Sequence, residues 1–214
     1  MKGRYVLAIS VSGLVLALSS LGARAQQRAL YQQTQYKGQE IGKLTGDVYY
    51  ARMDDYVSVF MVTPDGIILV EPIGTEFATW LKGELARRFN VPVKFVIYSH
   101  HHWDHGSGAA VYADTARLVG HENMLKHLAM PPAATLLPEN VRAQDTNGNG
   151  RIEQSEAQGN LKSQFALYDA DRDGELSGAE VIRGPLAFVR PPDLTYTDRI
   201  NINLDSPPLG HFTS

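Results

Sequence analysis

Hydrophobic and polar positions between residues 43 and 70 follow a pattern that predicts β-strands. Residues 43–52, 56–63 and 67–70 are rich in β-branched and aromatic side chains, which favour extended backbone. A Pro64-Asp65-Gly66 turn signal separates the last two segments, so we expect those two strands to form a hairpin. Residues 26–40, rich in Gln and Tyr, are expected to be a surface lead-in.

The spacing of apolar residues then becomes helical. Thr75 can cap a helix that runs to about Phe89, and one face of that helix would carry Phe77, Trp80, Leu81 and Leu85. The elements predicted next are a strand at 93–98, a short helix after 108, a strand at 116–119 and a helix at 122–128. Strands followed by alternating strand and helix predict an α/β fold with layered packing.

Metal-ligating side chains are dense directly after the strand predicted at 93–98, where the chain reads His100-His101-His102-Trp103-Asp104-His105-Gly106. Residues two apart in extended backbone point to the same side, so His100, His102 and Asp104 can converge while His105 follows a turn. Imidazole and carboxylate are ligands that zinc prefers. A solvated histidine patch is the alternative, but a buried strand seldom ends in one. The sequence therefore predicts a zinc site.

A strand that ends in His-x-His-x-Asp-His-Gly resembles the metallo-β-lactamase-fold hydrolases, and the resemblance covers about residues 41–129. It implies that His100, His102 and His211 hold a first zinc, while Asp104 and His105 contribute to a second. Zinc lowers the pKa of a bound water to about 7 and so supplies a nucleophile for hydrolysis. Asp104 is then the candidate catalytic residue, which orients the nucleophile or accepts its proton.

The same resemblance leaves the role of Glu71 open. This residue follows the strand at 67–70, where the family places a carboxylate that orients a metal ligand. The alternative is a surface carboxylate that merely ends a strand. Near the end of the chain, residues 200–204 alternate and predict another strand, and His211 follows in a Gly-His-Phe-Thr turn.

The resemblance is to the N-terminal half of the αββα sandwich. The family supplies a bridging Asp and a further metal-binding His after the third histidine, whereas only residues 212–214 follow His211. We therefore expect a truncated product in which one sheet keeps an uncovered apolar face. That face could associate with a second copy or with a chain that completes the sandwich.

Two acidic repeats, at residues 145–156 and 169–180, resemble EF-hand calcium loops. Gly150 and Gly174 occupy position 6 of the loops, where the turn is sharp. Ile152 and Leu176 occupy position 8, where paired loops contact each other through short strands. The calcium ligands expected from the pattern are Asp145, Asn147, Asn149, Arg151 (main-chain carbonyl) and Glu156 in the first loop, and Asp169, Asp171, Asp173, Glu175 (main-chain carbonyl) and Glu180 in the second.

Only about a dozen residues separate the two loops, which predicts one shared helix over residues 157–168. Its apolar stripe would contain Leu161, Phe165 and Tyr168. The side chains expected to face this stripe are Leu136, Leu137, Val141, Val181 and Ile182. The pair carries no Met-rich face, so we interpret it as a structural calcium clip rather than a sensor.

Composition and charge concern the location and the partners of the protein. Residues 1–25 combine basic residues, an apolar stretch and an Ala23-Arg24-Ala25 cleavage signal, which predicts a signal peptide and export to the periplasm or medium. A membrane anchor is the alternative. Without this segment 17 basic residues face 23 acidic ones, for a net charge of about −6, which argues against nucleic acid and anionic membranes as partners. The chain has no cysteine, so stability must come from the core and bound metal.

The sequence thus predicts a signal peptide (1–25), a metallo-β-lactamase-like half (26–130), an all-α EF-hand insertion (131–187) and a return to the first fold (188–214). Three interpretations remain open. The chain is an exported hydrolase of a small-molecule substrate with one or two zinc and two calcium ions, a calcium-binding protein on an inactive hydrolase remnant, or an interaction protein that pairs through its exposed sheet.

Overall fold

A computed structural model describes residues 38–204, and within them a seven-stranded sheet is the largest element of structure. The strand order is β1-β2-β3-β4-β5-β6-β9. Strands β1 to β4 are antiparallel neighbours, whereas β4, β5, β6 and β9 run parallel. The strands are β1 (Gln39–Thr45), β2 (Val48–Met53), β3 (Tyr56–Thr63), β4 (Gly66–Val70), β5 (Val93–Ile97), β6 (Arg117–His121) and β9 (Leu194–Tyr196).

The antiparallel half of the sheet corrects one prediction. Residues 43–52 do not form one strand, because a tight turn at Gly46 and Asp47 separates β1 from β2. Gly46 has a φ of 47°, which glycine adopts at low cost and which suits a two-residue hairpin turn. The hairpin predicted around Pro64-Asp65-Gly66 is present as β3 and β4.

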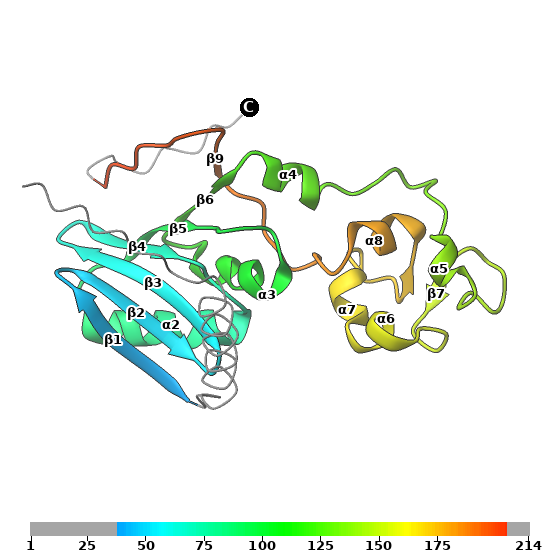
Figure 1. The fold of residues 1–214 in the computed structure, drawn as a ribbon, viewed down its shortest axis with the longest axis horizontal. Coiled ribbons are helices and arrows are strands. Elements are labelled where there is room, and N and C mark those ends of the chain that lie inside the picture. Colours follow the sequence, from blue (N-terminus) through cyan, green and yellow to red (C-terminus); the bar gives the residue numbers. More distant parts are fainter. Residues whose placement is uncertain (1–37, 205–214) are drawn as a thin grey trace, which may run out of the picture.

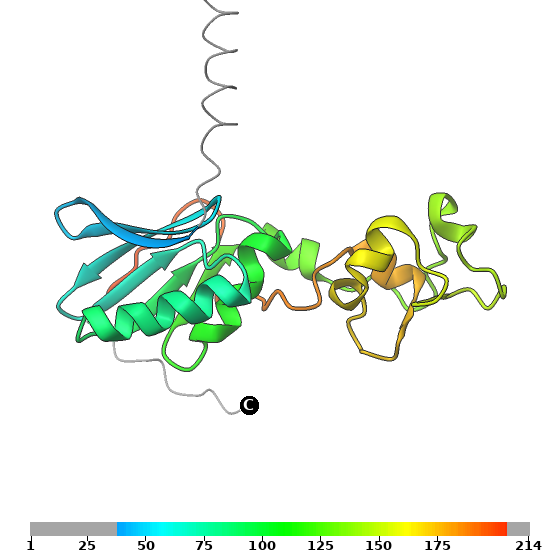
Figure 2. The same cartoon turned by 90° about the horizontal axis from the view of Figure 1, so that it is seen from below.

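Helix α2 (Thr75–Arg88) joins β4 to β5 and lies along one face of the sheet (Figures 1 and 2). Parallel strands need such a crossover. Phe77, Leu81 and Leu85 are buried as predicted, together with Ala78, while Trp80 packs against the core and is only partly buried. The sheet and α2 belong to the larger lobe, called the sheet lobe. Its other elements are α3 (Trp103–Gly106), the 3₁₀ helix η1 (Ser107–Tyr112) and α4 (Asn123–Leu128).

The opposite face of the sheet keeps apolar side chains in contact with solvent. On β3, Ser58 and Phe60 point into the core, whereas Val57, Val59 and Met61 are 45%, 36% and 38% exposed. Val70, paired with Val59 across the sheet, is also exposed. The predicted uncovered face is thus present among the described residues.

Residues 137–183 form a second, smaller lobe with its own core, which is drawn on the right in Figure 1. Strands β7 (Ile152–Glu153) and β8 (Glu175–Leu176) pair antiparallel, with Ile152 opposite Leu176. The contact expected between the two position-8 residues is therefore confirmed. The helices of this lobe are α5 (Glu139–Arg142), α6 (Gly159–Ser163), α7 (Phe165–Tyr168) and α8 (Gly178–Arg183).

Two details of this lobe differ from the prediction. The segment between the loops is two short helices rather than one, because Gln164 leaves helical geometry at φ −119° and ψ 20°. Leu161 and Phe165 still enter the core, with Tyr168 beside them. Of the facing side chains, Leu137, Val141 and Val181 join this core, whereas Leu136 and Ile182 are exposed.

The C-terminal part of the described chain returns to the sheet. Residues 194–196 form the edge strand β9, but residues 200–203 form no strand, which corrects the prediction for that segment. The predicted signal peptide and His211 lie outside residues 38–204. Within that range, no helix has the length and apolar character needed to cross a membrane.

Candidate metal centre

The histidine motif lies where the chain leaves β5. The second half of the motif does not have the extended geometry expected from the sequence, because Trp103–Gly106 form one helical turn, α3. The carbonyl of His102 accepts hydrogen bonds from the main-chain N–H groups of His105 (3.2 Å) and Gly106 (2.8 Å). His102 itself stays extended, with φ −60° and ψ 143°. Asp104 and His105 are thus presented from a helical turn.

Three imidazole rings of the motif lie together. The ring centroid of His100 is 4.6 Å from that of His102 and 4.5 Å from that of His105. The Ser99 hydroxyl is 2.7 Å from Nδ1 of His100, which leaves Nε2 as the nitrogen available to a metal. Burial, followed by the neighbouring His105 and His102, lowers the pKa of His100. The neutral imidazole is the form that binds metal.

Glu71, at the end of β4, contacts the motif directly. Its Oε1 is hydrogen bonded to Nδ1 of His105, while Nε2 of His105 lies 3.5 Å from Oδ2 of Asp104. One ligand atom from each of Glu71, His100 and His105 lies within 4.8 Å of the others. The contact supports the orienting role for Glu71 over that of a simple surface carboxylate, since it fixes the ring through Nδ1 and directs Nε2 toward Asp104, the other candidate ligand.

The backbone that carries Glu71 is strained and fastened to the motif. Glu71 and Ile73 have φ values of 70° and 59°, a region that costs a non-glycine residue about 1–3 kcal/mol. The N–H of Ile73 donates to the carbonyl of His105 (2.9 Å), and its carbonyl accepts from the N–H of Gly108 (2.8 Å). A Cβ at Gly108 would lie 2.6 Å from the carbonyl oxygens of Pro72 and Gly74, so only glycine allows this approach.

Tyr56 is a site residue that the sequence did not reveal. Its hydroxyl donates to Oδ2 of Asp104 at 3.4 Å, and its ring lies edge-on to His105 with centroids 5.8 Å apart. Burial and the negative charge of Asp104 raise the pKa of Tyr56, so its hydroxyl remains a donor at neutral pH. Tyr56 begins β3, which is far from the motif in sequence. The contact of Ser99 with His100 was not predicted either. Neither residue belongs to a sequence pattern with a characteristic spacing that would have identified it.

The other histidines that the structure describes do not belong to the group of ligand atoms formed by Glu71, His100 and His105. His102 is exposed and lies beside His100 without joining the group of three ligand atoms. His121 is held by the protein itself, because its Nε2 contacts the carbonyl of Thr197 at 2.7 Å and its Nδ1 accepts from the N–H of Asn123 at 3.1 Å. His127 stacks on His101 with centroids 4.1 Å apart.

A second group of metal-ligating atoms lies in the smaller lobe. Carboxylate oxygens of Asp169, Asp171 and Asp173 come within 4.8 Å of one another. Asp169 is only 9% exposed, and its Oδ1 is buried without a hydrogen-bond partner among the described residues. Glu180 is 3% exposed and accepts from the N–H groups of Ala170 and Ser177. The group thus combines two buried carboxylates, Asp169 and Glu180, with two exposed ones, Asp171 and Asp173.

The loop at residues 145–156 is folded by analogous hydrogen bonds. Asp145 accepts from the N–H groups of Gly148, Asn149 and Gly150 at 2.8–3.1 Å. Glu156, at the end of the loop, accepts from the N–H of Asn147 at 3.1 Å. Hydrogen bonding with Glu153 and then with Thr146 holds the pKa of Glu156 well below its usual value.

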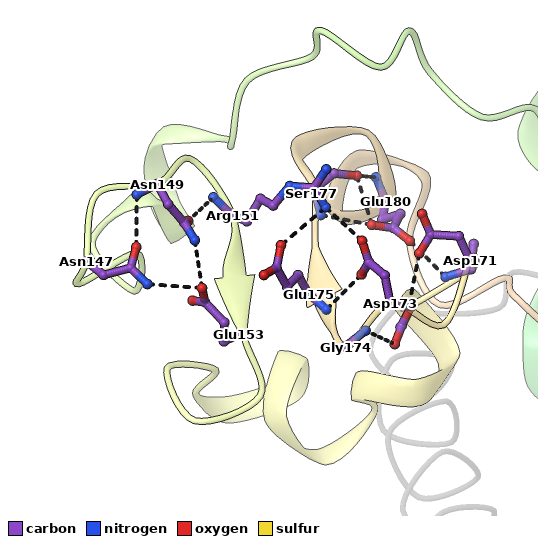
Figure 3. Close-up of polar contacts among 12 residues, drawn as sticks. Asn147, Asn149, Arg151, Glu153, Asp171, Asp173, Gly174, Glu175, Ser177 and Glu180 are labelled. Carbon is purple, nitrogen blue, oxygen red and sulfur yellow. Dashed lines mark hydrogen bonds and ion pairs between the residues drawn. The ribbon is translucent and has the colours of Figure 1, made fainter.

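Side-chain contacts also join the two loops. The side chains of Asn147 and Asn149 donate to Glu153 within the first loop, as Figure 3 shows. Nη1 of Arg151 in the first loop lies 2.9 Å from Oδ2 of Asp173 in the second, which is an ion pair. Both loops thus direct oxygen atoms of their own residues inward and are tied to each other.

Comparison with solved structures gives partial matches. A subclass B3 metallo-beta-lactamase from a soil metagenome library is 23% identical over 47% of this chain, with a TM-score of 0.40. The Rm3 metallo-beta-lactamase is 25% identical over 47% of this chain, also with a TM-score of 0.40. A metallo-beta-lactamase mutant from Legionella gormanii is 23% identical over 43%, with a TM-score of 0.39. The matches span 40%, 40% and 36% of those proteins, respectively.

A search of curated proteins found no match. The family model of the metallo-beta-lactamase superfamily, however, matches residues 52–194, which is well over half of the chain. The matched range includes the histidine motif, Glu71 and both acidic loops. The chain therefore belongs to the metallo-beta-lactamase superfamily.

Proposed function

We propose that the protein is an exported, zinc-dependent hydrolase of a small-molecule substrate that also binds two calcium ions through an EF-hand pair. The observation that carries the zinc part is the hydrogen bond between Glu71 and His105, with His100 beside it at the end of β5. Export rests on the residue pattern of positions 1–25.

The residues at the motif fit a zinc ion by their chemistry. His100, His102 and His105 offer imidazole nitrogens and Asp104 offers a carboxylate, which is a common donor set for zinc. His211 is the proposed additional ligand of the first zinc. A zinc ion held there would polarise the substrate and activate water for hydrolysis.

The protein's own groups have separate roles in this proposal. Glu71 holds the His105 ring in place through Nδ1. Asp104 is the candidate proton acceptor, and the Tyr56 hydroxyl donates a hydrogen bond to it. His100 stays neutral because burial and nearby histidines lower its pKa. The site is thus prepared for metal before any substrate enters.

The calcium part of the proposal rests on the second loop. Within residues 38–204, Asp169 has a buried oxygen without a hydrogen-bond partner, Asp171 and Asp173 lie beside it, and Glu180 closes the loop from a buried position. Oxygen ligands at these positions are those that calcium takes in a twelve-residue EF-hand loop. The ligands proposed for the first loop are Asp145, Asn147, Asn149, the carbonyl of Arg151 and Glu156.

Zinc titration by calorimetry tests the hydrolase proposal. We expect tight binding to the wild-type chain and a loss of at least tenfold in affinity for His100→Ala. His127→Ala is the matched control, because His127 is exposed on α4, stacks on His101 and is not a proposed ligand. Zinc binding unchanged by His100→Ala, or equally weakened by both substitutions, would contradict the proposal. Hydrolysis of a panel of chromogenic esters, lactones, β-lactams and sulfates by the zinc-loaded protein would then define the reaction.

The exposed sheet face favours a second candidate function, in which the protein associates with another chain through β3. Val57, Val59 and Met61 present a contiguous apolar row to solvent, and such rows mark interaction surfaces. In this alternative the motif is a remnant without turnover. Light scattering of the purified protein tests whether the chain associates. A dimer that the Val59→Lys substitution converts to a monomer would favour association through β3. A monomer at all concentrations would oppose it.

A further inference from the structure

A pocket of about 330 Å³ lies between the histidine motif and the chain that leaves the smaller lobe. Residues 101–104 form one wall, and Arg183, Pro185 and Leu186 form the other. Arg183 is the last residue of α8, the helix that contains Glu180 of the second acidic loop. The smaller lobe therefore supplies one side of the pocket beside the proposed metal centre.

The Arg183 guanidinium is fixed in place by main-chain acceptors. Its Nε donates to the carbonyl of Leu128 at 3.0 Å, and one terminal nitrogen donates to the carbonyl of Leu186 at 3.2 Å. A guanidinium has five N–H donors, so three remain available to a ligand. Holding the group in advance lowers the entropy cost of binding an anion.

Arg183 makes no close ion pair within the described residues, although Glu180 on the same helix acts on it at longer range. Within residues 38–204, no carboxylate lies within ion-pair distance of it, unlike Arg87, Arg151 and Arg190. The side chain is half-buried, and burial lowers its pKa because water no longer fully solvates the charge. A partly desolvated cation that is not held in a close ion pair binds an oxyanion more strongly than an exposed one does.

The other side of the pocket differs in character. Trp103 and Leu186 provide apolar surface, while Asp104 carries negative charge toward the metal motif. An anionic group would therefore be repelled from the Asp104 side unless metal is bound there, and attracted to Arg183. The arrangement suits a molecule with its reactive group at the motif and a carboxylate at the other end.

We propose that Arg183 is the substrate-recognition residue of this pocket and binds the carboxylate of a small anionic substrate. The inference rests on the proposed zinc site and adds the substrate class. It also gives the acidic-loop lobe a direct part in substrate binding. Arg183 is a specificity residue here, since it contacts a part of the substrate remote from the reacting bond.

Paired thiol probes test this inference without requiring turnover. Mercaptoacetate, 3-mercaptopropionate and 4-mercaptobutyrate each carry a zinc-binding thiol and a carboxylate, and the corresponding mercapto alcohols lack only the carboxylate. Calorimetry on the zinc- and calcium-loaded chain should show at least one carboxylate binding tenfold or more tightly than its alcohol. This wild-type comparison needs no variant and is safe from folding defects.

Variants then assign the preference to a residue. Arg183→Met should abolish the tenfold preference, and Arg183→Lys should retain part of it, because lysine keeps the charge but not the planar fork. Arg190→Met is the matched control, since Arg190 is an exposed arginine of the same segment that pairs with Asp193; it should retain the preference.

Each other outcome overturns the inference in a recognisable way. Equal affinities for carboxylates and alcohols would contradict the role of Arg183 while leaving the zinc proposal intact. A preference that persists in Arg183→Met would assign the carboxylate to another cation. Failure of every thiol to bind, together with absent zinc binding, would contradict the proposed function itself and this inference with it.

Discussion

The two candidate metal sites are built in opposite ways. The acidic loops draw all their proposed ligands from two continuous twelve-residue segments, and these segments surround a small core of their own. The histidine site instead combines the end of β4, helix α3 and the start of β3, through Glu71, His105 and Tyr56. A local site depends on the ion to balance its own charge, whereas a site assembled from distant segments depends on the sheet that brings them together.

Calcium removal should have the largest effect and should be confined to one lobe. Without a cation, the carboxylates of residues 169–180 repel one another, and a ligand at about 100 times its Kd contributes about 2.7 kcal/mol of stability. We expect hydrogen exchange to accelerate throughout residues 145–183 on adding EGTA, while strands β2 to β5 keep their protection. Equal loss of protection in both lobes would contradict the claim that the acidic loops depend on their ion independently of the sheet.

Glu180→Gln should weaken calcium binding at the second loop at least tenfold, or about 1.4 kcal/mol. The substitution removes the buried charge that closes the loop while keeping the size of the side chain. Calorimetric titration with calcium measures the change. Glu139→Gln, an exposed change on α5, should leave calcium affinity unaltered. Unchanged affinity in Glu180→Gln would refute the calcium assignment.

Gly108→Ala should destabilise the sheet lobe by about 1–3 kcal/mol, because the new methyl group would overlap the carbonyls of Pro72 and Gly74. The clash displaces the segment that carries Glu71, so zinc affinity should fall too. Urea denaturation monitored by tryptophan fluorescence reports this lobe, since Trp80 and Trp103 both pack against its core.

The matched control for Gly108→Ala is Gly83→Ala. Gly83 lies in α2 with no atom within 4 Å of an added Cβ, so alanine there should stabilise the helix by about 0.5–1 kcal/mol. The two glycine-to-alanine changes should therefore have opposite signs. Destabilisation of equal size by both would argue that the approach of residues 72–74 to Gly108 is unimportant.

Glu71→Gln should cause a roughly tenfold loss of zinc affinity and leave the fold intact. Glutamine can still hydrogen bond to His105 but no longer carries the charge that makes the ring a stronger ligand. The control is Glu76→Gln on the exposed first turn of α2. Competition with a chromogenic zinc chelator measures both variants, and identical affinities would remove Glu71 from the site.

The sequence predicted the parts of both regions that depend on local patterns, but not the contacts between distant segments. The histidine motif and the acidic loops are local patterns, and the expected contact between Ile152 and Leu176 is present. The roles of Tyr56 and Arg183 depend on chain segments far from the motif, which no local spacing encodes. The helical turn at residues 103–106 was missed because alternating ligands also suit an extended strand.

Metal content of the chain from residue 26 to 214, measured by plasma mass spectrometry after loading and desalting, tests the central claim most directly. The account predicts about two calcium ions and at least one zinc ion per chain. The His100→Ala/His102→Ala double variant should lose zinc and keep calcium, because the two sites are built independently. Absence of calcium from the wild type, or loss of both metals in the double variant, would contradict the account.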